Sequence, residues 1–314
     1  MGYNYKEIKF GIEVEFTGLS RRDAIQVVAN YFNFEAEYLG GAYDRYITYD
    51  NQLRRWRIER DSTVIPQRRN VRGKKVQSSE NFKCELVSPI LLYEDIPQLQ
   101  ELIRTLRRAG AFVNKRCSIH IHVDGNIFKE NPSALRHFCK IIFSKQFLLN
   151  KAIKVYSDRK SYCKDIEKDI IDRIDREKPE TLRQFGRTWF NSNTYAVTNR
   201  YNSRRYILLN PTPLLSNNQS KDTIELRIFN STLHAGIVKS FIQYVLLVAE
   251  RSLTVKRASS KVTIPLNGNE KWAMRQHLLK IGCKGEEFKS LRYHLLKNLE
   301  GDVAFKDMRR LKKK

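Results

Sequence analysis

Two glutamates stand two residues apart near the start of the chain, in the segment FGIEVEF at residues 10–16. Side chains at positions i and i+2 of a β-strand project from the same face, so Glu13 and Glu15 share one face and the apolar residues line the other. Two neighbouring carboxylates repel each other unless protons or a cation offset their charge. The pair is therefore a candidate metal or acid–base site, and a solvated face of an amphipathic strand is the alternative.

Three further strand-like segments carry acidic or metal-binding side chains on their polar faces. These side chains are Glu85 in residues 84–89, His120, His122 and Asp124 in residues 118–124, and Glu225 and Arg227 in residues 223–229. A single strand histidine is more often a core or surface residue than a ligand. Four such strands in one chain are not easily explained by chance, and they favour a shared site.

Glutamates with one histidine form an oxygen-rich ligand set. Such a set suits Mg²⁺ or Mn²⁺ better than a structural zinc ion. Two metal ions bound to polyphosphate oxygens would neutralise charge on a transferred phosphoryl group, and an arginine beside a ligand glutamate would hold that group. We expect Glu15→Gln and Glu225→Gln to abolish turnover and to leave the melting temperature unchanged or higher, because each removes a crowded carboxylate.

The elements that position these residues follow from hydrophobic periodicity. Strands are expected over residues 8–16, 45–60 (one or two), 82–87, 117–124 and 224–229, and helices over 20–32, from 96 to Gly110, from Asn131-Pro132 onward, and over 237–252, 270–280 and 285–299. Strands separated by long helices predict an α+β fold with a mainly antiparallel sheet backed by helices.

Domain boundaries follow from changes in composition. We predict one catalytic domain over residues 1–252, with a charged, exposed helical insertion at 157–180. Residues 253–314 are expected to form a small helical C-terminal region with a basic tail. Residues 66–79 are polar, basic and glycine-containing, which predicts a mobile loop.

The chain is strongly basic. Its 314 residues contain 58 Lys and Arg against 34 Asp and Glu, a net charge of +24. Such a surplus favours anionic partners such as nucleic acid, nucleotides or acidic macromolecules. Basic residues concentrate between residues 54 and 75 and again in the tail from Lys306.

Apolar segments and cysteine spacing bear on where the protein is located. The chain has no run of about 18 apolar residues, and its first residues lack the apolar core of a signal peptide. Its five cysteines are odd in number and form no C-x-x-C pair. These features predict a cytoplasmic protein that binds no membrane and has reduced, mostly buried cysteines.

Five motifs in chain order carry a resemblance to a known family. They are GIEVEF, WRIERDST, ELVSP, SIHIHVD and TIELRIF, which lie within residues 11–229. Read together, they resemble the motif series of the amidoligase family, and the resemblance covers roughly residues 8–250. One departure is Cys117-Ser118, where the family pattern leads us to expect a glycine before the histidines.

The resemblance implies a fold and a reaction. The fold would be the carboxylate–amine ligase fold of glutamine synthetase and glutamate–cysteine ligase. The activity would be ATP-dependent amide formation through an acyl phosphate, with ATP and Mg²⁺ or Mn²⁺ as cofactors. The carboxylate and amine could be small molecules or borne on macromolecules, and related ligases often form oligomers.

The resemblance also implies roles for individual residues. The metal ligands would be Glu13, Glu15, Glu85, His120 and Glu225, with Glu13 and Glu15 facing different cations. Arg227 would stabilise the transferred phosphoryl group. His122 and Asp124 would support the ligands or face the substrate. Arg57, Asp61 and Ser62 would lie close to the nucleotide. Arg205 and Asn210 would contact phosphate or substrate.

Two other function classes remain open at this point. His120, His122 and Asp124 could serve a metallohydrolase or a non-haem iron oxygenase, with His234 as a third ligand, but neither class explains the glutamates. The chain could also be a basic nucleic-acid-binding protein, although acidic strands fit poorly in such a groove. A thiol mechanism through Cys117 is disfavoured, because Cys117 and His120 would face opposite sides of their strand.

Overall fold

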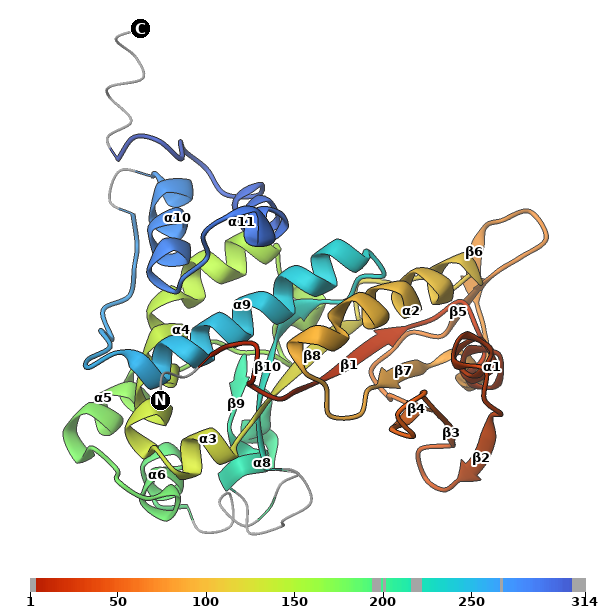
Figure 1. Ribbon diagram of the computed structural model, residues 1–314, viewed down its shortest axis with the longest axis horizontal. Helices are drawn as coiled ribbons and strands as arrows, with labels where there is room; N and C mark the ends of the chain where they lie inside the picture. Colours follow the sequence, from red (N-terminus) through yellow and green to blue (C-terminus); the bar gives the residue numbers. More distant parts are fainter. Residues whose placement is uncertain (1–3, 194–198, 200–201, 216–221, 266–267, 307–314) are drawn as a thin grey trace, which may run out of the picture.

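The computed structural model describes residues 4–193, 199, 202–215, 222–265 and 268–306. Its centre is an eight-stranded sheet in the order β2-β3-β4-β7-β1-β8-β10-β9, in which every paired strand runs antiparallel to its neighbour (Figure 1). The strands are β1 (Phe10–Phe16), β2 (Glu37–Gly40), β3 (Arg45–Tyr49), β4 (Arg55–Glu59), β7 (Cys84–Val87), β8 (Ser118–Asp124), β9 (Leu209–Asn210) and β10 (Thr223–Asn230). The expected α+β class with a large antiparallel sheet is confirmed.

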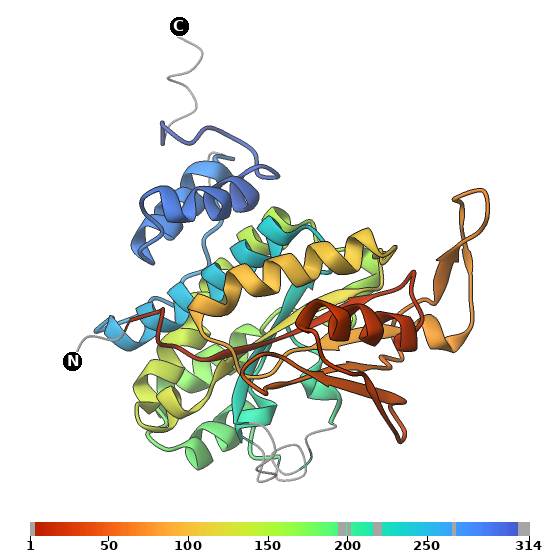
Figure 2. The ribbon, with the colours of Figure 1, turned by 45° about the vertical axis from the view of Figure 1, so that its right-hand side comes forward.

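Long helices pack on the apolar face of this sheet. They are α1 (Arg21–Phe32), α2 (Ile96–Arg108), α4 (Pro132–Ile153) and α9 (Ala235–Thr254), and Figures 1 and 2 show α2 and α9 crossing the central strands side by side. The alternation expected in the strands is borne out, because Ile12, Val14, Ile119 and Ile121 are fully buried beneath these helices. Every second residue of β1 and β8 therefore points to the opposite, polar face.

The helix starts agree with their capping signals. The side chain of Ser20 accepts a hydrogen bond from the backbone of α1, and Asn131 does the same for α4, with Pro132 in the first turn. These caps satisfy backbone N–H groups that have no partner within the helix. Local sequence chemistry therefore fixes where the two helices begin.

Shorter helices complete the fold. They are α3 (Asn126–Lys129), α5 (Lys168–Glu177), α6 (Leu182–Trp189), α8 (Thr212–Leu215), α10 (Glu270–Lys280) and α11 (Lys289–Leu296). Helix α11 packs against α9 and α4, and α10 packs against α11. The division at residue 252 stays a prediction, and the basic tail from residue 307 onward lies outside the described residues.

The expectation of a mobile loop at residues 66–79 is wrong in that this segment contains regular secondary structure. The segment forms a two-stranded hairpin of β5 (Gln67–Arg69) and β6 (Lys75–Gln77). The turn is closed by Asn70, whose side-chain oxygen accepts hydrogen bonds from the backbone of Arg72 and Lys74 at 3.0 Å each. Its strands carry too few apolar residues to show a strand-like hydrophobic pattern, so hydrophobic periodicity does not predict the hairpin.

The charged segment at residues 157–180 is less exposed than expected. It contains a single 3-10 turn at Ser157–Arg159 and the helix α5, and Ile170, Ile171 and Ile174 on α5 are buried. Arg159, which precedes α5, is only 2% exposed. An apolar stripe at helical spacing explains the burial, since one face of α5 packs inward while its charges stay in solvent.

Two further expectations concern membranes and cysteines. Within the part of the chain that the structure describes, no helix is long and apolar enough to cross a membrane. All five cysteines are described; each is buried and none is in a disulfide. Burial raises the pKa of the Cys117 thiol to about 12, so this group is a poor nucleophile at neutral pH.

Candidate active site

The strand register brings the acidic motifs together on the polar face of the sheet. Glu13 on β1 lies directly opposite His120 on β8, and Glu15 lies opposite Glu85 on β7. On the other side of β8, His122 lies opposite Glu225 on β10. Directly opposed residues share a face, so these side chains converge from four neighbouring strands.

The converging side chains form two overlapping groups with His120 in both. One group is Glu13, His120 and Glu225, and the other is Glu15, Glu85 and His120. In each group the nearest ligand atoms all lie within 4.8 Å of one another. Glu13 and Glu15 therefore belong to different groups, although they are only two residues apart.

The imidazole of His120 is the centre of the site. Its Nδ1 lies 3.2 Å from both Glu13 Oε2 and Glu225 Oε1, and its Nε2 lies 3.8 Å from Glu15 Oε1. Ser118 Oγ lies 2.8 Å from the same Nε2. Burial and the nearby Arg227 guanidinium lower the pKa of His120, so the ring is neutral and able to bind a metal ion at neutral pH.

Two of the carboxyls hold protons more strongly than usual. Burial, with the charge of Asp61, raises the pKa of Glu15 to about 8, although the backbone N–H and hydroxyl of Ser118 both donate to this carboxyl. Burial and the charges of Glu13, Asp61 and Glu15 raise the pKa of Glu85 well above its usual range. Among the described residues, none forms a hydrogen bond or ion pair with the Glu85 carboxyl.

The third buried glutamate has the opposite electrostatic character. Burial alone would raise the pKa of Glu225, but the Arg227 guanidinium and the two histidines hold it at about 2. Arg227 Nη1 lies 2.5 Å from Glu225 Oε1, and Asn210 Nδ2 donates to Glu225 Oε2 at 2.8 Å. Glu225 is therefore ionised and oriented in the protein as it stands.

The ligand atoms and charges of the site suit divalent metal ions. Four carboxylates and one neutral imidazole provide the hard oxygen ligands, with one nitrogen, that Mg²⁺ or Mn²⁺ accepts. Arg227 offsets the charge of Glu225, and Arg159 offsets part of the charge near Glu15, whereas the charges that act on Glu85 are carboxylates that repel it. A cation would offset this repulsion, so the residues fit the group that the resemblance implies.

A β-bulge lies at Arg227 and Ile228. The register of β10 against β8 shifts between Leu226 and Phe229, so the strand contains an additional residue there. Bulges bend a strand and redirect its side chains, and they are frequent beside active sites. Glu225 and Arg227 share the polar face through ordinary strand alternation, and the additional residue beyond them lets Phe229 pair with Ile119 and stay buried in the core.

The buried Arg159 holds this bulge in place, and sequence reasoning missed it. Its guanidinium donates to the backbone oxygens of Arg227 at 2.7 Å and Ile228 at 3.3 Å, and to Asn230 Oδ1 at 3.1 Å. Carbonyl oxygens turned out by a bulge need donors of this kind. No motif marks Arg159, which lies in a segment where most charged residues are exposed.

In addition to its ion pair with Glu225, the Arg227 side chain contacts a backbone carbonyl and an aromatic ring. Its Nε donates to the carbonyl of Tyr162 at 3.4 Å, and its guanidinium lies over the ring of Tyr206 at 5.9 Å from the centroid. Arg205 also lies over this ring, at 5.0 Å. Tyr206 therefore contacts both arginines, which places Arg205 next to the site but outside the acidic groups.

A cavity of about 400 Å³ adjoins the acidic groups at the start of β1 and the end of β8. Glu13, Arg57, His122 and Asp124 all line it. His122 Nε2 lies 3.2 Å from Glu13 Oε1, so the cavity directly adjoins the metal-ligand set through Glu13. The sequence predicted these four residues for one site, and the structure places all four on the cavity wall, with Glu13 belonging to the metal-ligand set as well.

The remaining predicted residues lie at the edge of the site. Asp61 acts on Glu15 and Glu85 through its charge, and its Oδ1 accepts a hydrogen bond from the backbone of Thr63 at 2.6 Å. Ser62 is exposed, and its carbonyl accepts a hydrogen bond from Lys83. The structure therefore places Asp61 near the metal-ligand set and shows no contact of Ser62 with it.

The alternative iron site lacks its third ligand. The side chain of His234 accepts a hydrogen bond from the backbone N–H of Ile237 and caps α9, and its ring packs against His294. It lies in neither of the two groups around His120. The oxygenase interpretation is therefore unsupported, whereas the glutamates it left unexplained form the site.

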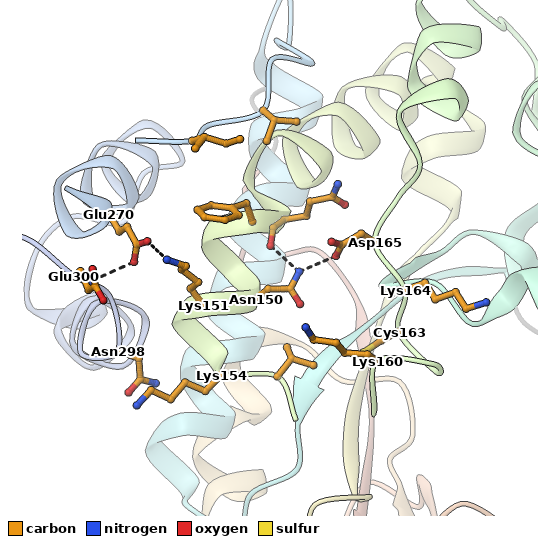
Figure 3. Close-up of a pocket in the computed structure, with 15 residues that line it drawn as sticks. Asn150, Lys151, Lys154, Lys160, Cys163, Lys164, Asp165, Glu270, Asn298 and Glu300 are labelled. Atoms are coloured by element: carbon orange, nitrogen blue, oxygen red, sulfur yellow. Dashed lines mark hydrogen bonds and ion pairs between the residues drawn. The ribbon is translucent and has the colours of Figure 1, made fainter. Parts of the chain in front are cut away.

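A second, larger cavity of about 830 Å³ lies between α4, residues 160–165 and the C-terminal helices. Figure 3 shows Lys151, Lys154 and Lys160 around it, with Lys151 paired to Glu270. Its lining includes none of the acidic strand residues. This lysine-lined cavity is therefore separate from the candidate active site.

Comparisons with known proteins agree with the motif series. The model of a family described as "putative amidoligase enzyme" matches residues 6–249. No curated protein matches the chain. Among solved structures, a bifunctional glutathione synthetase from Pasteurella multocida is similar at 12% identity and a TM-score of 0.32, over 93% of this chain and 47% of that one. The chain spans about half the length of that enzyme, and so distant a likeness carries no argument.

Proposed function

We propose, because this chain belongs to the amidoligase family, that it joins a carboxylate to an amine at the expense of ATP. The observation that carries the proposal is the convergence of Glu13, Glu15, Glu85, His120 and Glu225 into two groups beside Arg227. The proposal includes a glutamine synthetase-like carboxylate–amine ligase fold, with the polar face of the sheet as the catalytic side.

The reaction would proceed in two steps. An oxygen of the substrate carboxylate attacks the γ-phosphorus of ATP, the bond from that phosphorus to the bridging oxygen breaks, and ADP leaves. The amine nitrogen then attacks the acyl carbon of the acyl phosphate, inorganic phosphate leaves, and the nitrogen loses a proton. Both steps gather negative charge on phosphoryl oxygens, which the site must stabilise.

Two Mg²⁺ or Mn²⁺ ions would be held by the two groups around His120, where they would neutralise the charge on the ATP phosphates. Arg227 is oriented in advance by Glu225 and the Tyr162 carbonyl, so it can donate to phosphoryl oxygens without first being ordered. Asp61 and Arg205 flank the site and are proposed to contact the nucleotide or the substrate.

The cavity of about 400 Å³ beside Glu13 is the proposed substrate site. Lys9 and Arg57, which also lies 3.5 Å from Glu59, are proposed to attract a carboxylate. Asp124 is proposed to attract an amine, since the other lining aspartate, Asp222, pairs with Lys129. Its volume suits a small molecule or the end of a longer chain. Both reacting groups could therefore be bound within reach of the phosphoryl-transfer site.

Phosphate release tests this proposal. The protein is incubated with ATP, Mg²⁺ or Mn²⁺, and a matrix of amino-acid carboxylates and amines, and phosphate and ADP are measured together with the amide product. We expect release that requires metal, a carboxylate and an amine, and that Glu13→Gln abolishes. Release that is unaffected by EDTA, or equal in Glu13→Gln, would refute the proposal.

A further inference from the structure

The β5–β6 hairpin carries charge that the proposed ligase reaction does not use. Residues 67–77 read QRRNVRGKKVQ, with five cationic side chains and no acidic one. All five are exposed: Arg68, Arg69, Arg72, Lys74 and Lys75. In the described part of the chain, none of the five forms an ion pair with a carboxylate.

The hairpin is held firmly at its base. Gln67 exchanges hydrogen bonds with Thr17, whose hydroxyl donates to the Gln67 carbonyl and accepts from its N–H, both at 2.8 Å. The N–H of Ser78 donates to the Pro66 carbonyl at 2.9 Å. Figure 2 shows the hairpin projecting beyond the end of the sheet. Its cations are therefore presented on an ordered ribbon, which lowers the entropic cost of binding a partner.

The charge arrangement is unfavourable without an anion. Arg69 and Lys75 lie directly opposite each other, and like charges in that position are destabilising. Both lie over the ring of Phe112, at 5.4 and 4.5 Å from its centroid, which offsets part of the repulsion. Five cations without an acidic residue leave this repulsion uncompensated by carboxylates within the hairpin, so the arrangement points to an anionic partner.

The two faces of the ribbon indicate which anion it fits. Arg69 and Lys75 lie on one face, and Arg68, opposite Val76, lies on the other. A flat membrane could contact only one face at a time, whereas the major groove of B-form DNA admits a two-stranded ribbon between two phosphate backbones. Guanidinium groups also match phosphate geometry with paired hydrogen bonds.

We propose that the β5–β6 hairpin binds double-stranded DNA through its phosphate backbone, without reading sequence. The remaining exposed side chain of the turn, Val71, offers no hydrogen bond to a base edge. This binding is independent of the ligase reaction, because none of the hairpin residues belongs to the acidic groups.

Fluorescence anisotropy with a labelled 20-base-pair duplex of mixed sequence tests the proposal in the full chain. The hairpin variant is Arg68→Gln/Arg72→Gln/Lys74→Gln, whose positions are exposed. The matched control removes the same charge from the lysine-lined cavity of Figure 3, as Lys154→Gln/Lys160→Gln/Lys164→Gln. Circular dichroism melts confirm that both variants fold.

The wild type should bind with an affinity that falls steeply with salt. The hairpin variant should bind roughly 10- to 100-fold more weakly, with a logarithmic salt slope shallower by about 2 to 3, because each lost phosphate contact removes about 0.9 from the slope. The control should stay within about twofold of the wild type. Equal losses in both variants, or hairpin-dependent binding to vesicles with 30% anionic lipid and not to DNA, would overturn the proposal.

Discussion

The acidic residues of the central sheet and the basic residues of the β5–β6 hairpin are both clusters of like charge, but they lie in opposite environments. Glu15, Glu85 and Glu225 are 2%, 7% and 4% exposed. The cationic side chains of the β5–β6 hairpin are exposed, and the hairpin projects beyond the end of the sheet. Repulsion in the first region acts at low dielectric, whereas solvent and salt screen it in the second.

This difference determines which ligand each region suits. A buried pocket of oxygen atoms favours a small divalent cation, because the cation replaces solvent that burial has removed. An exposed ribbon of cations favours an extended polyanion, since many weak and screened contacts add up along a backbone. Repulsion between like charges therefore indicates a cation-binding catalytic centre on the acidic face of the sheet and an anion-binding surface on the β5–β6 hairpin.

The largest expected effect is on catalysis at the acidic face. Arg227→Lys keeps the positive charge beside Glu225 but loses the planar fork of donors, so we expect kcat to fall about a thousandfold with little change in melting temperature. Arg54→Lys is the matched control, because Arg54 pairs with Asp50 and Asp95 in the described structure. Steady-state phosphate release measures both, and a loss below tenfold in Arg227→Lys would contradict the assigned role.

The next effect separates two glutamates of the same site. Glu225→Gln leaves Arg227, whose side chain is 14% exposed, without its paired carboxylate, so we expect the metal-free protein to lose about 2–4 kcal/mol of unfolding free energy. Glu85→Gln removes an unpaired, repelled carboxyl, so we expect unchanged or higher stability. Urea unfolding in EDTA measures both variants.

Equal changes in the two variants would show that the acidic residues behave as one uniform cluster. The prediction for Glu225 also revises the expectation from sequence, in which removing any crowded carboxylate relieves repulsion. That expectation treated Glu15 and Glu225 alike, whereas the direct ion pair with Arg227 lowers the pKa of Glu225 and burial raises the pKa of Glu15.

The stability of the metal-free protein should also depend on pH. The folded state raises the pKa of Glu15 to about 8 from 4.5, so between these values it holds a proton that the unfolded chain has released, and stability falls as pH rises. Glu85 acts with the same sign. His120, whose pKa is lowered from 6.5, acts with the opposite sign below that value, so the clearest window is pH 6.5 to 8.

Across that window we expect a loss of about 2 kcal/mol or more in EDTA. Saturating Mn²⁺ should remove most of the loss, because the metal-bound carboxylates need no proton. Urea unfolding at several pH values, with and without Mn²⁺, measures the effect. A flat profile in EDTA would mean that these carboxyls are solvated in the folded protein.

The smallest effect is expected in the hairpin. The variant Arg68→Gln/Arg72→Gln/Lys74→Gln should change the unfolding free energy by less than about 0.5 kcal/mol, because exposed side chains away from packing contribute little. Urea unfolding at low and high salt measures the change. A loss above about 1 kcal/mol would mean that these cations support the fold and would weaken the contrast between the two regions.

Local sequence patterns predicted much of the acidic face. Strand alternation placed Glu13, Glu15, His120 and Glu225 on polar faces, and the strand order β7-β1-β8-β10, which the sequence did not predict, brings those faces together. The division of these ligands around His120 follows from the strand register, which only the folded sheet fixes.

Other features of the molecule depend on contacts between distant segments. Arg159 has a role only because it meets the bulge of β10, which lies nearly 70 residues further along the chain. The opposite pKa shifts of Glu15 and Glu225 depend on which charges become their neighbours. The hairpin was missed because its turn, not a hydrophobic pattern, defines it.

The central claim is that the acidic face binds two divalent cations, one in each group around His120. Titration of the protein with Mn²⁺ at pH 7.5, followed by electron paramagnetic resonance, tests it most directly. We predict two bound Mn²⁺ per chain, one fewer in Glu85→Gln and one fewer in Glu13→Gln. The absence of bound Mn²⁺ at millimolar concentration, or unchanged binding in the Glu13→Gln/Glu85→Gln double variant, would contradict the claim.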